Sequence, residues 1–368
     1  MDFDFTEDQR ALREQAERFL EENCGYAAAR AVLEGGGPFD RALWGRIAEL
    51  GWMGAAIPEA YGGVGLGHVE LAVIAEQLGR HAAPVPFSST VYVLAEALML
   101  AGSEEQKRTW LPRIAGGEVI GALAVSEGPK RATPKSLATA VMDGRLSGVK
   151  TPVADGDVAD VAVVLAKDGA GASLFLAELG GVAREAAPTF DPARSHGALT
   201  FQNAAVERLG PAGEGWTLLE RVLDRAAVLM AFEQVGGAQA ALDMAKAYAM
   251  DRYAFGRSIA SFQAIKHKLA DVYIAVEIAR SNAYYGAWAL ANAAPDLSVA
   301  AAAARVAASE AYEHASRENI QTHGGMGFTW EFDCHLHYRR AKLLSLQLGA
   351  PRVWKNRLID ALEARNAA

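Results

Sequence analysis

The sequence is poor in cysteine, in runs of one charge sign and in long apolar segments. Its two cysteines, Cys24 and Cys334, lie far apart and outside any Cys-x-x-Cys pair, which argues against a disulfide framework or a thiolate metal site. No sustained Lys/Arg run offers a phosphate-neutralising face, and the net charge is -8, so nucleic acid is not the expected partner. The apolar stretches are alanine-rich and interrupted by charges, which predicts no transmembrane span.

A secretion signal is also missing. The segment Met1–Phe5 is acidic rather than basic and precedes an amphipathic pattern, so we expect a cytoplasmic protein. With 368 residues, of which 51% are hydrophobic, the chain is long enough for two or three structural units with cores of their own.

The first third of the chain reads as a helical domain, residues 1–117. Thr6 and Gln9 form a capping-box pattern that predicts a helix to Asn23, and Asp40 precedes a second helix that Gly51 ends. The apolar pattern predicts further helices near Val69–Leu78, Val91–Leu100 and Glu104–Ile114.

The middle third, residues 118–216, has the pattern of a β domain, which we expect to be a mostly antiparallel barrel or sandwich. Asp143-Gly144 is a hairpin signal inside it. The candidate strands are Val119–Val125, Leu137–Met142, Val158–Ala166, Ser173–Leu179 and Ala198–Phe201.

Residues 217–368 predict a four-helix bundle. The first helix should start at Thr217, whose hydroxyl is placed to cap with Glu220, and run to about Met250. The other three helices are predicted over 265–276, from Ser298 to about Asn319, and over Glu331–Leu348.

Two segments between these helices carry candidate binding residues. Arg252, Phe255 and Gly256 follow the first long helix, and Gln263 opens the next one. A guanidinium and an amide at helix ends suit a pyrophosphate and an adenine, since Arg can contact phosphate oxygens bidentately. Taken alone, the segment favours an ordinary interhelical loop that has a capping arginine.

The second segment, Gln321–Phe328, has three glycines in a helix connection. Glycine lets the backbone approach a ligand and exposes N–H groups to anionic oxygens. A glycine-rich connection without a ligand is the alternative. The specific feature is the combination of Gln-x-x-Gly-Gly-x-Gly-Phe with Arg-x-x-Phe-Gly about seventy residues earlier.

This combination resembles the flavin-binding signature of the acyl-CoA dehydrogenase family. The resemblance extends over nearly the whole chain and implies the order helical domain, β domain, helical bundle. It implies FAD as cofactor, with Arg252, Phe255 and Gln263 at positions that hold the diphosphate and adenosine of a neighbouring subunit's FAD.

By the same resemblance, Gln321, Gly324 and Gly325 match positions that meet the FAD diphosphate and adenine. The family desaturates acyl-CoA thioesters at Cα–Cβ in fatty acid or lipid catabolism and usually passes electrons to electron-transfer flavoprotein. Its members assemble as homodimers, homotetramers or heterotetramers with a paralogous subunit.

The chain departs from the family where the chemistry takes place. The two positions that match the family's catalytic glutamate hold Leu348 and Ala226, so the catalytic residue is unknown. Glu233 and Asp224 lie nearby in sequence, but their helical positions favour solvated or bundle-pairing roles. Ala227 replaces an arginine that the family often places next to the substrate.

Two further departures concern the flavin. Pro152-Val153-Ala154 stands where the family has a flavin-facing Trp-x-Thr, and the loop Ser126–Ala132 lacks the serine that meets cofactor and acyl chain.

Three functional hypotheses follow. The leading one is an FAD-dependent acyl-CoA dehydrogenase subunit. The alternative is a catalytically silent partner that completes the FAD and substrate site of a heteromer. A third is an active enzyme whose base lies outside the aligned positions.

Two other motifs give little support to other chemistry. His335-x-His337 has a spacing that splays two imidazoles apart on a helix, so we predict exposed or interfacial histidines and no metal site. The serines lack a Gly-x-Ser-x-Gly elbow, which gives no support for nucleophilic hydrolysis.

Overall fold

The computed structural model describes residues 5–367 and divides the chain into two compact units. The bundle unit comprises Met1–Ala31, His68–Ala83 and Ala227–Ala368, and the sheet unit comprises Val32–Gly67 and Pro84–Ala226. Residues 1–4, which hold most of the acidic N-terminal segment, lie outside the description. The three-part division at 117 and 216 stays a prediction.

Among the described residues, no helix combines the length and apolar content needed to cross a bilayer.

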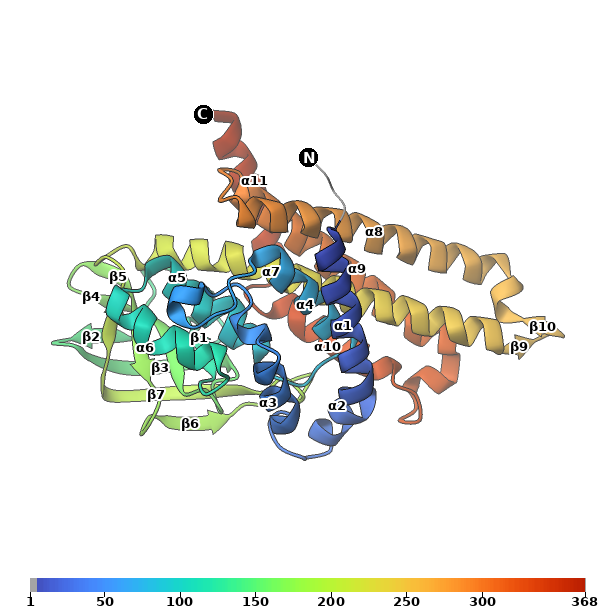
Figure 1. Ribbon diagram of the computed structural model, residues 1–368, viewed down its shortest axis with the longest axis horizontal. Coiled ribbons are helices and arrows are strands. Elements are labelled where there is room, and N and C mark those ends of the chain that lie inside the picture. The colour runs from blue at the N-terminus through green and yellow to red at the C-terminus, as the bar shows by residue number, and fades with distance from the viewer. Residues whose placement is uncertain (1–4, 368) are drawn as a thin grey trace. The chain divides into compact units, whose positions relative to one another are not determined.

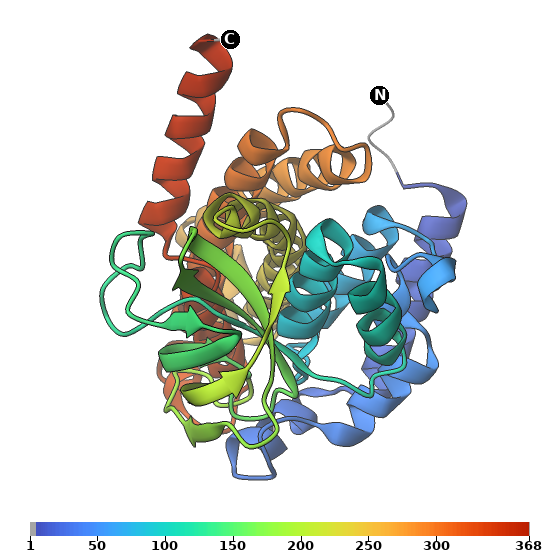
Figure 2. The same ribbon diagram turned by 90° about the vertical axis from the view of Figure 1, so that its left-hand side faces the viewer.

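The sheet unit packs short helices beside one curved sheet, which Figure 2 shows with the strands in green. Its helical elements are α3 (Arg41–Glu49), η1 (Trp52–Gly54), η2 (Glu59–Tyr61), a π-helical segment η3 (Ser88–Ala95), α5 (Glu96–Ala101) and α6 (Glu104–Ala115). Its strands are β1 (Gly121–Ala124), β2 (Ala140–Met142), β3 (Arg145–Ala154), β4 (Val161–Asp168), β5 (Gly171–Glu178), β6 (Ala183–Ala186), β7 (His196–Ala205) and β8 (Glu207–Leu209).

The sheet is mixed but mainly antiparallel, with the order β6-β7-β3-β2-β4-β5-β8 and β1 beside β4. The parallel pairings are β1 with β4 and a single contact of β2 with β4. Strand β4 is buried from Val161 to Ala166, as expected for a central strand. The hairpin at Asp143-Gly144 is confirmed, because Met142 pairs with Arg145 on either side of it.

All five predicted strands are present, but β3, β6 and β8 were not predicted. In β3, Gly148, Lys150 and Pro152 break the alternation that marks a strand. Lys150 is nevertheless buried, because its ammonium lies 2.8 Å from the carboxylate of Glu127.

The bundle unit is helical. Its helices are α1 (Glu7–Asn23), α2 (Tyr26–Leu33, which ends just past the unit boundary), α4 (His68–Arg80), α8 (Gln263–Ala291), α9 (Leu297–His323), α10 (Cys334–Leu346) and α11 (Pro351–Ala367). Helix α7 (Gly215–Asp251) begins in the sheet unit and continues into the bundle unit. Figure 1 shows the longest helices, α7, α8 and α9, running side by side while α1 crosses them and α11 projects away. The predicted fold class is confirmed, with α11 as an addition.

Local capping signals account for several helix boundaries. The capping box of Thr6 and Gln9 is present, and Asp40 accepts a hydrogen bond from the N–H of Leu43 at 2.9 Å. Gly51 follows α3 with a φ of 73°. The prediction that Thr217 caps α7 is wrong, because the helix begins at Gly215 and Glu220 instead accepts a hydrogen bond from the Trp216 indole.

The tightest contact in the bundle unit is the crossing of α4 and α7. A Cβ added to Gly79 would lie 1.8 Å from the carbonyl oxygen of Glu233, and one added to Gly236 would lie 1.8 Å from that of Glu76. Both backbones therefore touch where each helix has a glycine. Beside the crossing, Glu76 pairs with Arg280 of α8 in a largely buried ion pair.

Replacing Gly236 with alanine should therefore destabilise the protein, although alanine is the better helix former by about 1 kcal/mol. The new methyl group forces the two helices apart, and overpacking of this kind typically costs about 1–3 kcal/mol. Urea unfolding of Gly236→Ala measures the change. In the matched control Gly25→Ala, the Cβ meets nothing within 4 Å, so we expect a change within about 0.5 kcal/mol. Equal free energies of unfolding for Gly236→Ala and Gly25→Ala would contradict the close backbone contact between α4 and α7.

Candidate cofactor-binding site

The connection between α7 and α8 is a tight β-hairpin. β9 (Tyr253–Ala254) pairs with β10 (Arg257–Ser258), and the two residues between them, Phe255 and Gly256, have φ of 53° and 76°. Positive φ at both central residues is the type I′ geometry, which an aromatic residue adopts only under strain. Phe255 is also 96% exposed. A strained and exposed aromatic ring at a loop tip is typical of a contact with another molecule.

Arg252 is fixed by its backbone and free at its side chain. Its N–H donates to the carbonyl of Tyr248 at 2.9 Å, and its carbonyl accepts from the N–H of Ile259 at 2.8 Å. Within residues 5–367, the exposed guanidinium has no hydrogen-bond or ion-pair partner. Its five donors are therefore available to an external anion.

The start of α8 adds to this positive end. The N-cap residue Phe262 supplies no capping side chain, and Gln263 is exposed as the first helical residue. A helix N-terminus without a cap leaves N–H groups that suit a phosphate. Arg257, which the sequence interpretation missed, lies 4.1 Å over the ring of Phe262. The only sequence signal for Arg257 is its position directly after the Phe-Gly turn.

The glycine-rich segment follows α9 directly and folds into the short helix η5 (Gly324–Phe328). Gly324 has a φ of 59°, which favours glycine, whereas Gly325 does not have a positive φ. A Cβ at either position would meet nothing within 4 Å. Gln321 and Phe328 are exposed beside them. The backbone at Gly325 is therefore open to close approach by a ligand, although local packing does not require glycine there.

An aromatic cluster brings the two segments to the same end of the bundle. Tyr248, four residues before Arg252, stacks on His323 at a centroid distance of 4.0 Å, and Phe332 packs edge-on against Tyr248 at 5.7 Å. Lys268 of α8 and Glu318 of α9 are joined by a 3.3 Å ion pair nearby. The ends of α7 and α9 are thus fixed against each other, and with them Arg252 and Gln321.

The two positions expected to hold a catalytic base carry none. Leu348 lies between α10 and α11 with a φ of 62°, and its carbonyl accepts from the Trp354 indole at 3.2 Å. Ala226 is completely buried in α7. The structure therefore gives neither position a carboxylate.

Buried Arg305 holds the backbone just before Leu348. Its guanidinium donates to the carbonyls of Leu344 and Gln347, the latter at 2.6 Å, and to the side chain of Gln234. Burial lowers the pKa of Arg305 to about 9, against the opposing effect of the Glu233 charge. Glu233 is itself completely buried in the bundle, and Asp224, on the sheet-unit part of α7, is 8% exposed.

In the sheet unit, Glu127 fastens the loop that includes Ser126–Ala132. Its carboxylate accepts from the N–H groups of Ala138 and Thr139 and from Lys150. Partial burial raises the pKa of Glu127, but these hydrogen bonds outweigh it and lower the pKa to about 2. In β3, Val153 is fully buried, so its side chain belongs to the core of this unit.

The two histidines of His335-x-His337 have separate environments. His337 is completely buried between the hydroxyls of Tyr26 and Tyr312, at 2.7 and 2.9 Å, which corrects the prediction that it is exposed or interfacial. Burial lowers its pKa to about 3, so it is neutral at pH 7. His335 stacks on Trp330 at 4.3 Å. No set of three or more potential His, Cys, Asp or Glu ligands comes together in the described part of the chain.

Comparisons with known proteins give the family. The family model described as acyl-CoA dehydrogenase, N-terminal domain, matches residues 6–118, and the C-terminal domain model of the same family matches residues 213–362. Together they cover more than half of the chain.

Individual relatives agree with the family models. Acyl-CoA dehydrogenase IpdE2 of Mycobacterium tuberculosis is 34% identical over 96% of both chains. A chain in the crystal structure of the ChsE4–ChsE5 complex of the same organism is similar, with a TM-score of 0.89 and 30% identity over 99% of this chain and 99% of that chain. Butyryl-CoA dehydrogenase of Megasphaera elsdenii has a TM-score of 0.90 and 27% identity, over 98% of this chain and all of its own.

These matches confirm the resemblance seen in the sequence and the cofactor that it implies, since enzymes of this family are oxidoreductases that bind FAD. The chain belongs to the acyl-CoA dehydrogenase family.

Proposed function

We propose that this chain is a subunit of an FAD-dependent dehydrogenase that acts on an acyl-CoA thioester. The observation that supports the proposal is the exposed Arg252–Gly256 hairpin, which lies at the same end of the bundle as Gln321 and Gly325 because Tyr248 stacks on His323. A free guanidinium, an uncapped helix N-terminus and open glycine backbone are groups that suit the diphosphate and adenosine of FAD.

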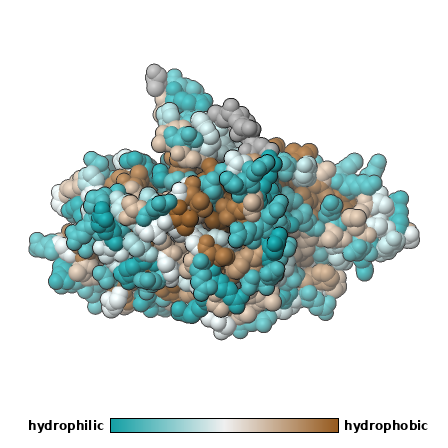
Figure 3. Space-filling model, in the orientation of Figure 1, coloured by the Kyte–Doolittle hydropathy of each residue, from teal (hydrophilic) through white to brown (hydrophobic). Residues whose placement is uncertain are grey.

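The proposed assembly is an oligomer, because the hairpin and Phe255 project from the chain without covering any of its own core. A second surface favours the same conclusion. Tyr273, Ile274 and Ile278 are each more than half exposed on α8, and Figure 3 shows apolar surface along this helix. The partner is a second copy of the chain or a paralogous subunit. The similarity to the ChsE4–ChsE5 complex, which contains two differently named chains, supports the second possibility.

The residues at the two base positions indicate which subunit supplies the catalytic base. Bound FAD supplies the acceptor for the β-hydride of the thioester, and the α-proton must go to a carboxylate within hydrogen-bonding reach. Leu348 and Ala226 cannot accept that proton. This favours the alternative in which the chain completes a site on a catalytic paralogue, while electron-transfer flavoprotein is the proposed electron acceptor.

Loss of the Arg252 guanidinium should weaken FAD binding. A charge-assisted hydrogen bond contributes about 1.5–3 kcal/mol, so Arg252→Ala should raise the Kd for FAD by roughly 10- to 150-fold. The Kd is measured by titrating the apo-assembly with FAD and monitoring the flavin fluorescence. Arg18→Ala is the control, since it removes an exposed arginine of α1 and should leave the affinity unchanged. A folded Arg252→Ala variant with wild-type affinity would reject the assignment.

The chain alone should desaturate straight-chain acyl-CoAs slowly or not at all, since a positioned base contributes about 10²- to 10⁴-fold. Leu348→Glu should increase the rate of flavin bleaching by acyl-CoA if the thioester still binds. The control is Leu346→Glu, which adds the same carboxylate two residues earlier, at a side chain that is 45% exposed. This control should not increase the rate of flavin bleaching. Fast turnover by the wild-type homo-oligomer would contradict the silent-partner function.

A further inference from the structure

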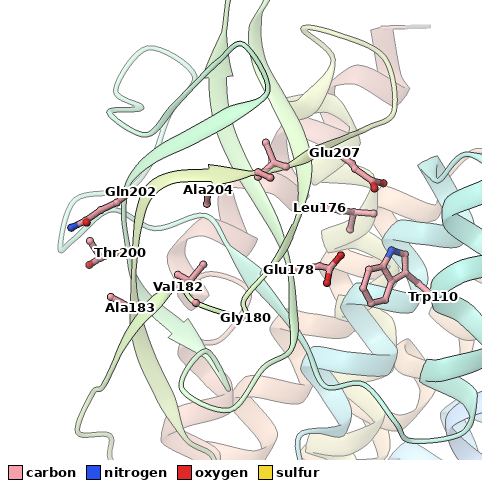
Figure 4. A pocket seen from close by; sticks show the side chains of 13 residues that line it. Trp110, Leu176, Glu178, Gly180, Val182, Ala183, Thr200, Gln202, Ala204 and Glu207 are labelled. Carbon is pink, nitrogen blue, oxygen red and sulfur yellow. The ribbon is translucent and has the colours of Figure 1, made fainter.

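The sheet unit contains a half-open cavity of about 500 Å³ whose lining residues all belong to that unit. None of the candidate flavin-binding residues contributes to it. Figure 4 shows β5 and Trp110 of α6 on one side and β6 and β7 on the other. A cavity of this size is within the range of small-molecule sites, which is about 300–1,000 Å³.

The topology of the sheet explains the opening. β6 and β8 are the end strands of the sheet order and do not pair with each other. The loop between β5 and β6 passes through Gly180 and Gly181, and neither glycine has an atom within 4 Å of the place where a Cβ would be. Small side chains at Ala183 and Ala204 leave further space. The gap is therefore built into the sheet.

The indole of Trp110 lines the cavity, and its N–H has no acceptor in the described chain. The residue as a whole is only 6% exposed. In Figure 4 this edge of the ring lies toward the cavity side that carries Leu176 and Glu207. The N–H is open to the cavity, so an acceptor that enters the cavity can reach it. A ligand oxygen would be such an acceptor.

Two exposed carboxylates at the rim give the cavity its charge. Glu178 has no hydrogen-bond or ion-pair partner in the described chain, and Glu207 accepts from the amide of Gln106 at 3.2 Å with one of its two oxygens. The lining includes no Lys, Arg or His. Outside the lining, the guanidinium of Arg113 lies 4.8 Å from the ring centroid of Trp110 and 3.9 Å from the carboxylate of Glu118. The electrostatic potential that the lining residues create therefore favours a cation as the ligand of the cavity.

The remaining lining residues are suited to a short aliphatic body. Leu176, Val182 and Val206 supply apolar surface, and Thr200 and Gln202 add hydroxyl and amide groups on the opposite side. An inorganic cation would leave this apolar surface and the indole donor unused.

We propose that the cavity binds a small organic ammonium that also carries a hydrogen-bond-accepting oxygen, as in an amino alcohol. The ammonium pairs with Glu178 and Glu207, and the oxygen accepts from the indole of Trp110. This inference does not depend on the proposed dehydrogenase function.

Calorimetric titration of the intact protein at constant ionic strength tests the proposal with three probes. They are 4-aminobutan-1-ol, n-butylammonium, which lacks the oxygen, and butane-1,4-diol, which lacks the charge. We expect saturable binding in the order 4-aminobutan-1-ol, n-butylammonium, diol, with roughly millimolar affinity for a first probe this small. No saturable binding of either ammonium, or equal binding of the diol, would overturn the proposal.

Substitutions assign the two recognition groups. Glu178→Gln should weaken both ammonium probes about ten-fold or more, whereas Glu185→Gln, an exposed residue of β6 outside the cavity lining, should not. Trp110→Phe should remove the preference for 4-aminobutan-1-ol over n-butylammonium while n-butylammonium still binds. Equal effects of Glu178→Gln and Glu185→Gln would show that the cavity is not the site, even if Trp110→Phe fails to fold.

Discussion

The backbone contact between α4 and α7 is the constraint on which the bundle unit depends. Because Gly79 and Gly236 have no side chains, the helices approach until each would-be Cβ is 1.8 Å from a carbonyl oxygen of the other helix. This approach places Glu76 beside Arg280 and so connects α4 with α8. It fixes the part of α7 that continues to Tyr248 and Arg252 at the cofactor-binding end.

At that end, order comes from aromatic packing and ionic pairing rather than from the candidate binding residues themselves. Tyr248, His323 and Phe332 lock α7 to the segment after α9, while Arg252 and Phe255 remain exposed. The supporting residues are therefore satisfied within the chain, and the binding groups are left for an external partner. Such a division is expected where a ligand or second subunit completes the site.

Structural features that depend on residues close together in the sequence could be predicted, whereas features that depend on distant segments could not. The caps at Thr6 and Asp40 were predictable because capping depends on residues three positions apart. Strand β3 was not, because burial of Lys150 depends on Glu127 in a different segment. The motif around Arg252 located the candidate site, but the positive φ of Phe255 and the stack on His323 require the folded chain. The cavity near Trp110 likewise combines segments far apart in sequence.

The central claim is that FAD is held through groups that this chain presents to an assembly. Native mass spectrometry of the FAD-loaded protein across a dilution series tests it most directly, since it reports subunit number and bound FAD in the same ion. The account predicts that FAD is found on oligomers, with a paralogue included where one is required, and is lost as they dissociate. A monomer that retains a full equivalent of FAD would contradict it.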